Sequence, residues 1–145
     1  MAPNEELTNQ LEEALRQVNA ILFKRGRSIL MDMEISALQF NALLTIRDLG
    51  PLTMGELCKN LFVACSTATD LADRMEQSEL AERTRDGKDR RVVKLRLLAK
   101  GKEVLEAVIA ERQSLIREVL RDNPDGEYDE LLKGLKLLVQ RMELK

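Results

Sequence analysis

The chain has 145 residues, 44% of them hydrophobic and 33% charged, a balance that is typical of one globular domain and inconsistent with intrinsic disorder. It contains no histidine, so the commonest metal ligand and the commonest general acid or base are absent, and the sequence predicts no enzyme activity, no cofactor and no metal site. The net charge of −2 indicates no general attraction to nucleic acid, and an aromatic content of 3% disfavours a stacking surface for single strands.

Two amphipathic helices are predicted at the start of the chain. Over residues 5–30, apolar side chains recur every three or four positions and predict a helix with one buried stripe, which Gly26 weakens locally. The stripe consists of Leu7, Leu11, Leu15, Val18, Leu22 and Ile29. Ser36 followed by Gln39 is a capping-box pattern that predicts the start of a second helix, and Gly50-Pro51 predicts its end.

A helix-turn-helix is predicted next. Thr53 and Glu56 form a second capping-box pattern and open a short helix. A turn over residues 62–65 leads to a further helix from Ser66 to Ser78. Helical spacing places four of its side chains on the inner side, namely Ala68, Leu71, Ala72 and Met75.

A two-stranded hairpin and two more helices complete the chain. In residues 83–85 and 93–97, charged side chains alternate with other side chains in a period of two, which predicts half-exposed strands. The pair Asp86-Gly87 between them is a hairpin signal. A long helix is predicted from Ala99 to a break near Asn123-Pro124, and a last helix follows over residues 128–142. The expected fold class is therefore mainly α with one small β-hairpin.

Positive charge is concentrated in the hairpin. Residues 83–100 contain eight lysines and arginines and only two acids, Asp86 and Asp89, which is a net charge of +6 on an otherwise acidic chain. Cations on a protruding element neutralise phosphates and release counterions, although a run of charge by itself is more often a solvated surface. The position of this run directly after a helix-turn-helix favours DNA binding.

The segment LCKNLFVACSTATDLADRMEQSELAERTRDGKDRRVVKLRLLAKG, residues 57–101, resembles the helix-turn-helix and wing of the MarR family, the multiple antibiotic resistance type of bacterial winged-helix transcription regulators. The run Asp86-Gly87-Lys88-Asp89-Arg90-Arg91 is its most specific part. The flanking helices also resemble the family, so the resemblance covers residues 1–145 as a single domain. It implies a winged helix-turn-helix core at about 36–101 and dimerisation helices at about 5–30 and 102–143.

The helix from Ser66 to Ser78 resembles the family's recognition helix, which enters the major groove. The resemblance and the helical spacing together leave five side chains of this helix to face DNA, namely Ser66, Thr67, Thr69, Asp70 and Arg74. Arg74 suits a guanine or a phosphate, and Thr69 suits a base edge or a thymine methyl. Asp70 departs from the family, because many relatives carry a basic residue at this position. The Asp70 carboxylate repels phosphate but can accept a hydrogen bond from cytosine N4. The alternative for each is an ordinary solvent-facing residue.

The hairpin resembles the family's wing. Arg91 matches the position whose guanidinium inserts into the minor groove. Asp89 is expected to orient Arg91 through a charge-assisted fork, to cap its own turn, or to do both. Lys88 and Arg90 are expected to contact phosphates, and Arg85 belongs to the same DNA-binding set.

Two departures from the family affect the ends of the recognition helix. Ala64 stands where relatives often have a serine that caps the helix, which leaves Ser66 or the chain turn to do so. Glu79 stands where glycine commonly ends the helix, so a tight or strained exit is expected.

The two cysteines, Cys58 and Cys65, form no disulfide framework of the secreted kind. Cys58 is expected to be a small buried hydrophobe. Cys65 is a candidate redox residue, because the start of a helix favours the thiolate, and one hypothesis is that its oxidation switches DNA binding. The N-terminal helix contains no cysteine, so the peroxide-sensing arrangement of some relatives is not indicated.

Together these features predict a cytoplasmic transcription regulator. No uncharged run approaches the ~20 residues of a membrane span, and no signal pattern opens the chain. The resemblance implies a homodimer that represses by binding a palindromic operator in double-stranded DNA, with half-sites about 34–36 Å apart, and that a small-molecule effector or an oxidant releases. Three long amphipathic helices carry more apolar surface than one winged helix covers, which also favours a dimer. The alternative is a winged-helix module whose basic hairpin binds an acidic protein.

Overall fold

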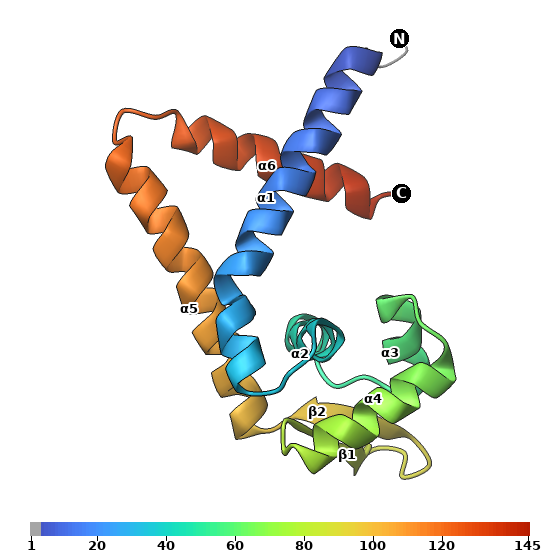
Figure 1. Ribbon diagram of the computed structural model, residues 1–145. Coiled ribbons are helices and arrows are strands. Elements are labelled where there is room, and N and C mark those ends of the chain that lie inside the picture. The colour runs from blue at the N-terminus through green and yellow to red at the C-terminus, as the bar shows by residue number, and fades with distance from the viewer. Residues whose placement is uncertain (1–3) are drawn as a thin grey trace. The chain divides into compact units, whose positions relative to one another are not determined.

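The computed structural model describes residues 4–145 and contains, over that range, six helices and one two-stranded antiparallel hairpin (Figure 1). The elements in chain order are α1 (Glu5–Asp32), α2 (Ala37–Leu49), α3 (Met54–Leu61), α4 (Cys65–Gln77), β1 (Ala81–Arg85), β2 (Val93–Leu97), α5 (Ala99–Asp122) and α6 (Tyr128–Glu143). Each element expected from the sequence is present, so the predicted fold class is confirmed.

The chain divides into two compact units, one that ends at Arg112 and one that comprises Gln113–Lys145. The first unit contains α1 to α4, the hairpin and the beginning of α5, and the second contains the rest of α5 and α6. The helix-turn-helix of α3 and α4 and the hairpin therefore lie together in the first unit.

Both predicted capping boxes are confirmed. The Ser36 hydroxyl accepts the backbone N–H of Gln39 at 3.1 Å, and the Gln39 side chain accepts the N–H of Ser36 at 2.8 Å. The Thr53 hydroxyl accepts the N–H of Glu56 at 3.1 Å, and the Glu56 carboxylate accepts the N–H of Thr53 at 3.4 Å. These bonds satisfy N–H groups that have no partner within the helix, and so they set where α2 and α3 begin.

The ends of α4 are set by its backbone. The helix begins at Cys65, one residue before the predicted start, and its N-cap Ala64 makes no side-chain hydrogen bond. Ser66 is thus inside the helix and does not cap it. At the other end Glu79 has φ 59°, a left-handed conformation that favours glycine, and the N–H of Leu80 donates to the carbonyl of Met75 at 2.9 Å. The strained exit predicted from Glu79 is confirmed.

The hairpin pairs in register from Ala81 opposite Leu97 to Arg85 opposite Val93. Leu52, between α2 and α3, extends this pairing by one bridge, because its N–H donates to the Leu95 carbonyl at 3.1 Å and its carbonyl accepts the Leu95 N–H at 2.7 Å. The connection over residues 86–92 is longer than the two-residue turn for which Asp-Gly is best known. Hydrogen bonds from the Arg85 side chain and to the Asp86 side chain stabilise that longer connection.

One apolar core joins α4 to the hairpin and to α2, α3 and α5. The four α4 side chains predicted to face inward are at most 5% exposed, which confirms that face of the helix. Among the largest fully buried side chains, Leu43 comes from α2, Leu57 from α3, Leu80 from the turn after α4, Leu95 from β2 and Leu105 from α5. Burial of this kind contributes about 1.5–3 kcal/mol for each large side chain, so α4 and the hairpin are held against the same core.

The apolar stripe that the sequence predicts for α1 is not covered by this chain's own residues over its first four positions. The side chains of Leu7, Leu11, Leu15 and Val18 are between 36% and 54% exposed. The helix α1 is continuous through Gly26, and Gly26 is buried. A Cβ at Gly26 would lie 2.6 Å from Cγ1 of Val108, so glycine allows α1 to lie against α5 there (Figure 1).

No single helix within residues 4–145 has both the length and the apolar composition to span a membrane. The pair α1 and α2 meets those two criteria only when taken together, across a bend of 105°. Five residues of α2 are buried, four of them in the apolar core.

Gly101 provides a test of the packing between α5 and the end of α4. A Cβ there would overlap the carbonyl oxygen of Leu80 and lie 3.2 Å from Cδ2 of Leu43. We expect Gly101→Ala to lower the free energy of unfolding by about 1–3 kcal/mol, measured by urea denaturation at fixed protein concentration.

Gly134→Ala is the matched control, because a Cβ at Gly134 in α6 meets nothing within 4 Å. There the same substitution is expected to raise the free energy of unfolding by about 0.5–1 kcal/mol, since alanine favours a helix. Changes of the same sign and size in both variants would contradict the close approach at Gly101.

Candidate nucleic-acid interface

The outer face of α4 carries the five side chains predicted for the recognition helix. All five, Ser66, Thr67, Thr69, Asp70 and Arg74, are exposed, whereas the opposite face is buried in the core. The Thr69 hydroxyl donates to the Cys65 carbonyl at 3.0 Å, so it remains an acceptor toward solvent. The face therefore offers hydroxyls, one carboxylate and one guanidinium, which are the groups that bind base edges and phosphates.

Asp70 and Arg74 contact each other one helical turn apart. The Arg74 Nη2 atom lies 3.4 Å from Asp70 Oδ2, and both side chains are about two-thirds exposed. Exposed pairs of this kind contribute little to stability, so both groups can exchange partners when another charged molecule approaches. The spacing of four residues was a signal for this pair that the sequence analysis did not use.

Asp89 holds Arg91 at the end of the hairpin. The Arg91 guanidinium donates through Nε to Asp89 Oδ1 at 3.2 Å and through Nη2 to Oδ2 at 3.3 Å, while the Arg91 backbone N–H donates to Oδ1 at 3.0 Å. The predicted fork and the predicted turn cap are both present. Because 91% of the Arg91 side chain remains exposed, its charge is oriented without being covered.

The fork also affects the titration of Asp89. The side-chain hydrogen bond from Arg91, followed by the backbone bond from the same residue, lowers the pKa of Asp89 below its usual 3.8. A lowered pKa means that the fork is complete above that usual value and is lost only as the pH falls through the lower value. The Arg91 orientation is therefore independent of pH throughout the neutral range.

Backbone and side-chain hydrogen bonds fold residues 86–92, which we call the wing tip. The Arg85 guanidinium donates to the Arg90 carbonyl at 2.7 Å, and the Lys88 N–H donates to Asp86 Oδ1 at 2.9 Å. The Arg85 side chain therefore braces the wing tip, although it is also exposed. Lys88 and Arg90 are exposed, and within residues 4–145 neither has a carboxylate partner.

Arg83 connects the hairpin to α4, a role that the sequence analysis missed. Its guanidinium lies 2.9 Å from Asp73 Oδ1, pairs with the Glu76 carboxylate, and donates to the Thr69 carbonyl at 3.4 Å. Burial lowers the pKa of Arg83, but the hydrogen bonds that its guanidinium donates to Glu76 and Asp73 outweigh burial and raise that pKa. The side chain is 26% exposed, so this cation is held within the fold.

The charge of the hairpin is less available than the sequence indicates. Four of the eight basic side chains in residues 83–100 are paired with acids, two of them with acids outside that segment: Arg83 with Asp73 and Glu76, Arg91 with Asp89, Lys94 with Asp86 and Arg96 with Glu82. The net charge of +6 on residues 83–100 therefore overstates the number of cations that have no acidic partner. The other four of these eight cations, Arg85, Lys88, Arg90 and Lys100, have no carboxylate partner within residues 4–145, and three of the four belong to the wing tip or border it.

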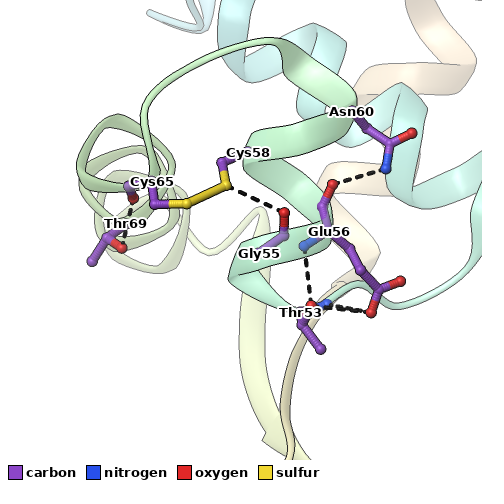
Figure 2. Close-up of a disulfide and its surroundings, with 7 residues drawn as sticks. All are labelled: Thr53, Gly55, Glu56, Cys58, Asn60, Cys65 and Thr69. Atoms are coloured by element: carbon purple, nitrogen blue, oxygen red, sulfur yellow. Dashed lines mark hydrogen bonds between the residues drawn. A yellow bond between two sulfur atoms is a disulfide. The ribbon is translucent and has the colours of Figure 1, made fainter.

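The two cysteines are joined across the turn between α3 and α4 (Figure 2). Cys58 is 7% exposed, as predicted for a buried hydrophobe, but it is also bonded to Cys65. The expectation of separate roles for Cys58 and Cys65 is therefore wrong, because the turn of three residues between α3 and α4 brings their Cα atoms to 5.2 Å from each other. Cys65 is exposed at the first position of α4, next to Ser66 and Thr67, which the sequence analysis predicts to face DNA.

Comparisons with known proteins show similarity in sequence and in fold. A sequence model described as MarR family matches residues 35–93. The chain is 40% identical to the HTH-type transcriptional regulator YsmB of Bacillus subtilis, over 93% of this chain and 92% of that protein. It is 30% identical to the HTH-type transcriptional repressor MdtR of Bacillus subtilis, over 83% of this chain and 77% of that protein. A solved MarR family protein from Bacillus stearothermophilus is 42% identical and superposes with a TM-score of 0.84, over 98% of this chain and 99% of that one.

Replacement of Arg83 tests the connection between the hairpin and α4. We expect Arg83→Gln to lower the free energy of unfolding by about 1 kcal/mol, because the carboxylates of Asp73 and Glu76 lose a half-buried partner. The loss should shrink as salt is added to a urea denaturation series, since ions screen the pair in the parent protein.

Lys88→Gln removes a cation from the same hairpin without breaking an ion pair, and its free energy of unfolding should stay within about 0.5 kcal/mol of the parent value. If the two variants were equally stable, Arg83 would not hold the hairpin to α4.

Proposed function

The chain belongs to the MarR family of winged-helix transcriptional regulators, and from this membership we propose that it is a repressor that binds a palindromic operator in double-stranded DNA as a homodimer. The resemblance further implies release from the operator by a small-molecule effector. The proposal includes no catalytic step. A protein that acts on the operators of its own cell works in the cytoplasm, which is where we place it.

The single observation that carries the proposal is the exposed, oriented guanidinium of Arg91 on the same compact unit as the exposed polar face of α4. In the proposed complex α4 lies in the major groove and Arg91 inserts into the adjacent minor groove, whose negative potential is strongest where it is narrow. Asp89 positions Arg91 by its fork and does not contact DNA. Lys88, Arg90 and Arg85 contact phosphates.

Within α4, Arg74 and Asp70 are the residues that we propose to determine sequence. Their contact of 3.4 Å has to open when DNA binds, which frees Arg74 for a guanine or a phosphate and Asp70 for cytosine N4. Ser66 and Thr67, at the start of the helix, suit phosphate oxygens, and Thr69 suits a base edge or a thymine methyl.

The homodimer is supported by apolar side chains that the single chain leaves exposed. In α1 these are Leu7, Leu11, Leu15 and Val18, which follow one face of the helix. In α6 no residue is buried, and Leu131, Leu135 and Met142 are each at least 44% exposed. Soluble proteins rarely leave faces of this extent in water, and we propose that a second copy of the chain covers them.

The repressor role is supported by the likeness to MdtR, which is named a repressor. A dimer that occupies an operator within a promoter blocks transcription by exclusion. The runner-up function, a module that binds an acidic protein through the wing tip, relies on the same exposed cations. The salt dependence of binding to duplex DNA separates the two, because log affinity for B-DNA falls with log salt by about 0.9 for each phosphate neutralised.

Arg91→Ala tests the wing contact with DNA. Duplexes selected by the protein from a random pool would be used in fluorescence anisotropy titrations at several salt concentrations. We expect the variant to raise Kd roughly tenfold to a hundredfold, as for other arginines that contact bases. Lys88→Gln should instead weaken binding to all sequences and reduce the salt slope by about 1.

The control for that experiment is Lys145→Gln, which removes an exposed cation at the end of the chain and should leave Kd unchanged. Unchanged affinity in Arg91→Ala would remove the minor-groove contact from the proposal. If the selection yielded no bound duplex even at low salt, the proposal of DNA binding itself would be overturned.

Leu11→Lys tests the dimer. A charged side chain in the middle of the α1 stripe should dissociate the dimer, which sedimentation equilibrium measures as a fall from twice the chain mass toward the chain mass. Leu49→Lys is the control, since Leu49 is 58% exposed at the end of α2 and lies outside the stripe. A monomeric parent protein, or a Leu11→Lys dimer of parental strength, would contradict an interface on α1.

A further inference from the structure

The pair Cys58 and Cys65 lies inside the helix-turn-helix, and both cysteines of the chain belong to it. Cys58 is on α3, Cys65 is the first residue of α4, and the disulfide closes the turn between them (Figure 2). Their Cα–Cα distance of 5.2 Å is in the middle of the range that disulfides require, about 4.4–6.8 Å. The fold of the turn therefore places two thiols where each can react with the other.

The two positions differ in access and in electrostatics. Cys65 is exposed at the start of a 13-residue helix whose N-cap, Ala64, makes no side-chain hydrogen bond to the first turn. Unpaired N–H groups and the helix dipole stabilise a thiolate over a thiol at such a position. Cys58 is buried, and its Sγ lies 3.2 Å from the Gly55 carbonyl oxygen, which can accept the proton of the reduced thiol (Figure 2).

We propose that Cys65 and Cys58 are a peroxide-reactive dithiol pair, in which Cys65 is the attacking residue and Cys58 the resolving one. The Cys65 thiolate attacks one oxygen of a hydroperoxide, the O–O bond breaks, and the other oxygen leaves as water or an alcohol after protonation. The Cys65 sulfenic acid then reacts with the Cys58 thiol, the S–S bond forms, and a second water leaves. Two thiols lose two electrons and two protons, the peroxide gains them, and a dithiol reductant reverses the change.

The role of Cys58 in DNA binding rests on the proposed function. Cys65 immediately precedes Ser66 and Thr67, which face the phosphates in that proposal. A sulfinate or sulfonate on Cys65 would add a negative charge at that site, and like charges across an interface weaken binding strongly. The disulfide is uncharged, and in the structure that contains it Thr69, Asp70 and Arg74 remain exposed. Cys58 thus limits oxidation of Cys65 to a reversible product that is compatible with DNA.

Intact-mass spectrometry of the full chain after exposure to hydrogen peroxide tests the pair without any DNA. The parent protein should lose two hydrogens and show no free thiol, and a dithiol reductant should restore both. Cys58→Ala should instead gain oxygens on Cys65, and Cys65→Ser should keep its Cys58 thiol unmodified under the same exposure, because that thiol is buried; peptide mapping separates these changes from sulfoxides on the exposed methionines. A parent protein that keeps two free thiols, or that gains oxygens as fast as Cys58→Ala does, would overturn the proposal.

Operator affinity, measured on the same samples, tests the consequence. Each protein is compared with its own reduced form, so any effect of the substitution on folding cancels. We expect peroxide to change Kd less than about threefold in the parent protein and to raise it at least about tenfold in Cys58→Ala. Loss of DNA binding by the parent disulfide form would overturn the protective role of Cys58. Absence of operator binding by the reduced protein would count against the proposed function alone, because the mass measurement still decides the dithiol chemistry.

Discussion

The ion pairs of Arg83 with Asp73 and Glu76 fix the position of the hairpin relative to α4. Below them, Met75 of α4, Leu80 in the turn and Leu95 of β2 are fully buried in one core. Apolar packing between the hairpin and α4 is not directional. The hydrogen bonds from the half-buried Arg83 guanidinium to two carboxylates require a defined geometry, and so they specify how the two elements are placed. The two surfaces proposed to enter adjacent DNA grooves therefore belong to one compact unit, in which α4 and the hairpin are joined by ion pairs as well as by the core.

The distribution of ion pairs decides which cations a negatively charged partner can reach. Of the four basic side chains on the strands, Arg83, Lys94 and Arg96 are paired with acids, and Arg85, at the end of β1, is not paired with any acid among residues 4–145. The wing tip instead presents Lys88 and Arg90, together with an Arg91 whose orientation is set by Asp89. The unpaired cations of the hairpin are thereby concentrated near its end, on a protein with a net charge of −2, which suits localised contact with a duplex better than general adhesion.

The local structure of this protein is determined by residues close together in the sequence. The boxes Ser36–Gln39 and Thr53–Glu56 start two helices, and the inner face of α4 follows from helical spacing. Because a capping bond spans three residues and a helical face repeats every three or four, a short window of sequence contains the whole interaction. The same holds for the fork between Asp89 and Arg91, two residues apart.

Interactions between distant residues were decided by the tertiary structure. The sequence alone determined the helices, the hairpin, the inner face of α4 and the candidate DNA-facing residues. It did not determine that Arg83 binds acids on α4, that Gly26 permits contact with Val108, or that the stripe of α1 remains exposed. Each of these depends on which segments the folded chain brings together, and burial or pairing across such separations is a property of packing that no local period encodes.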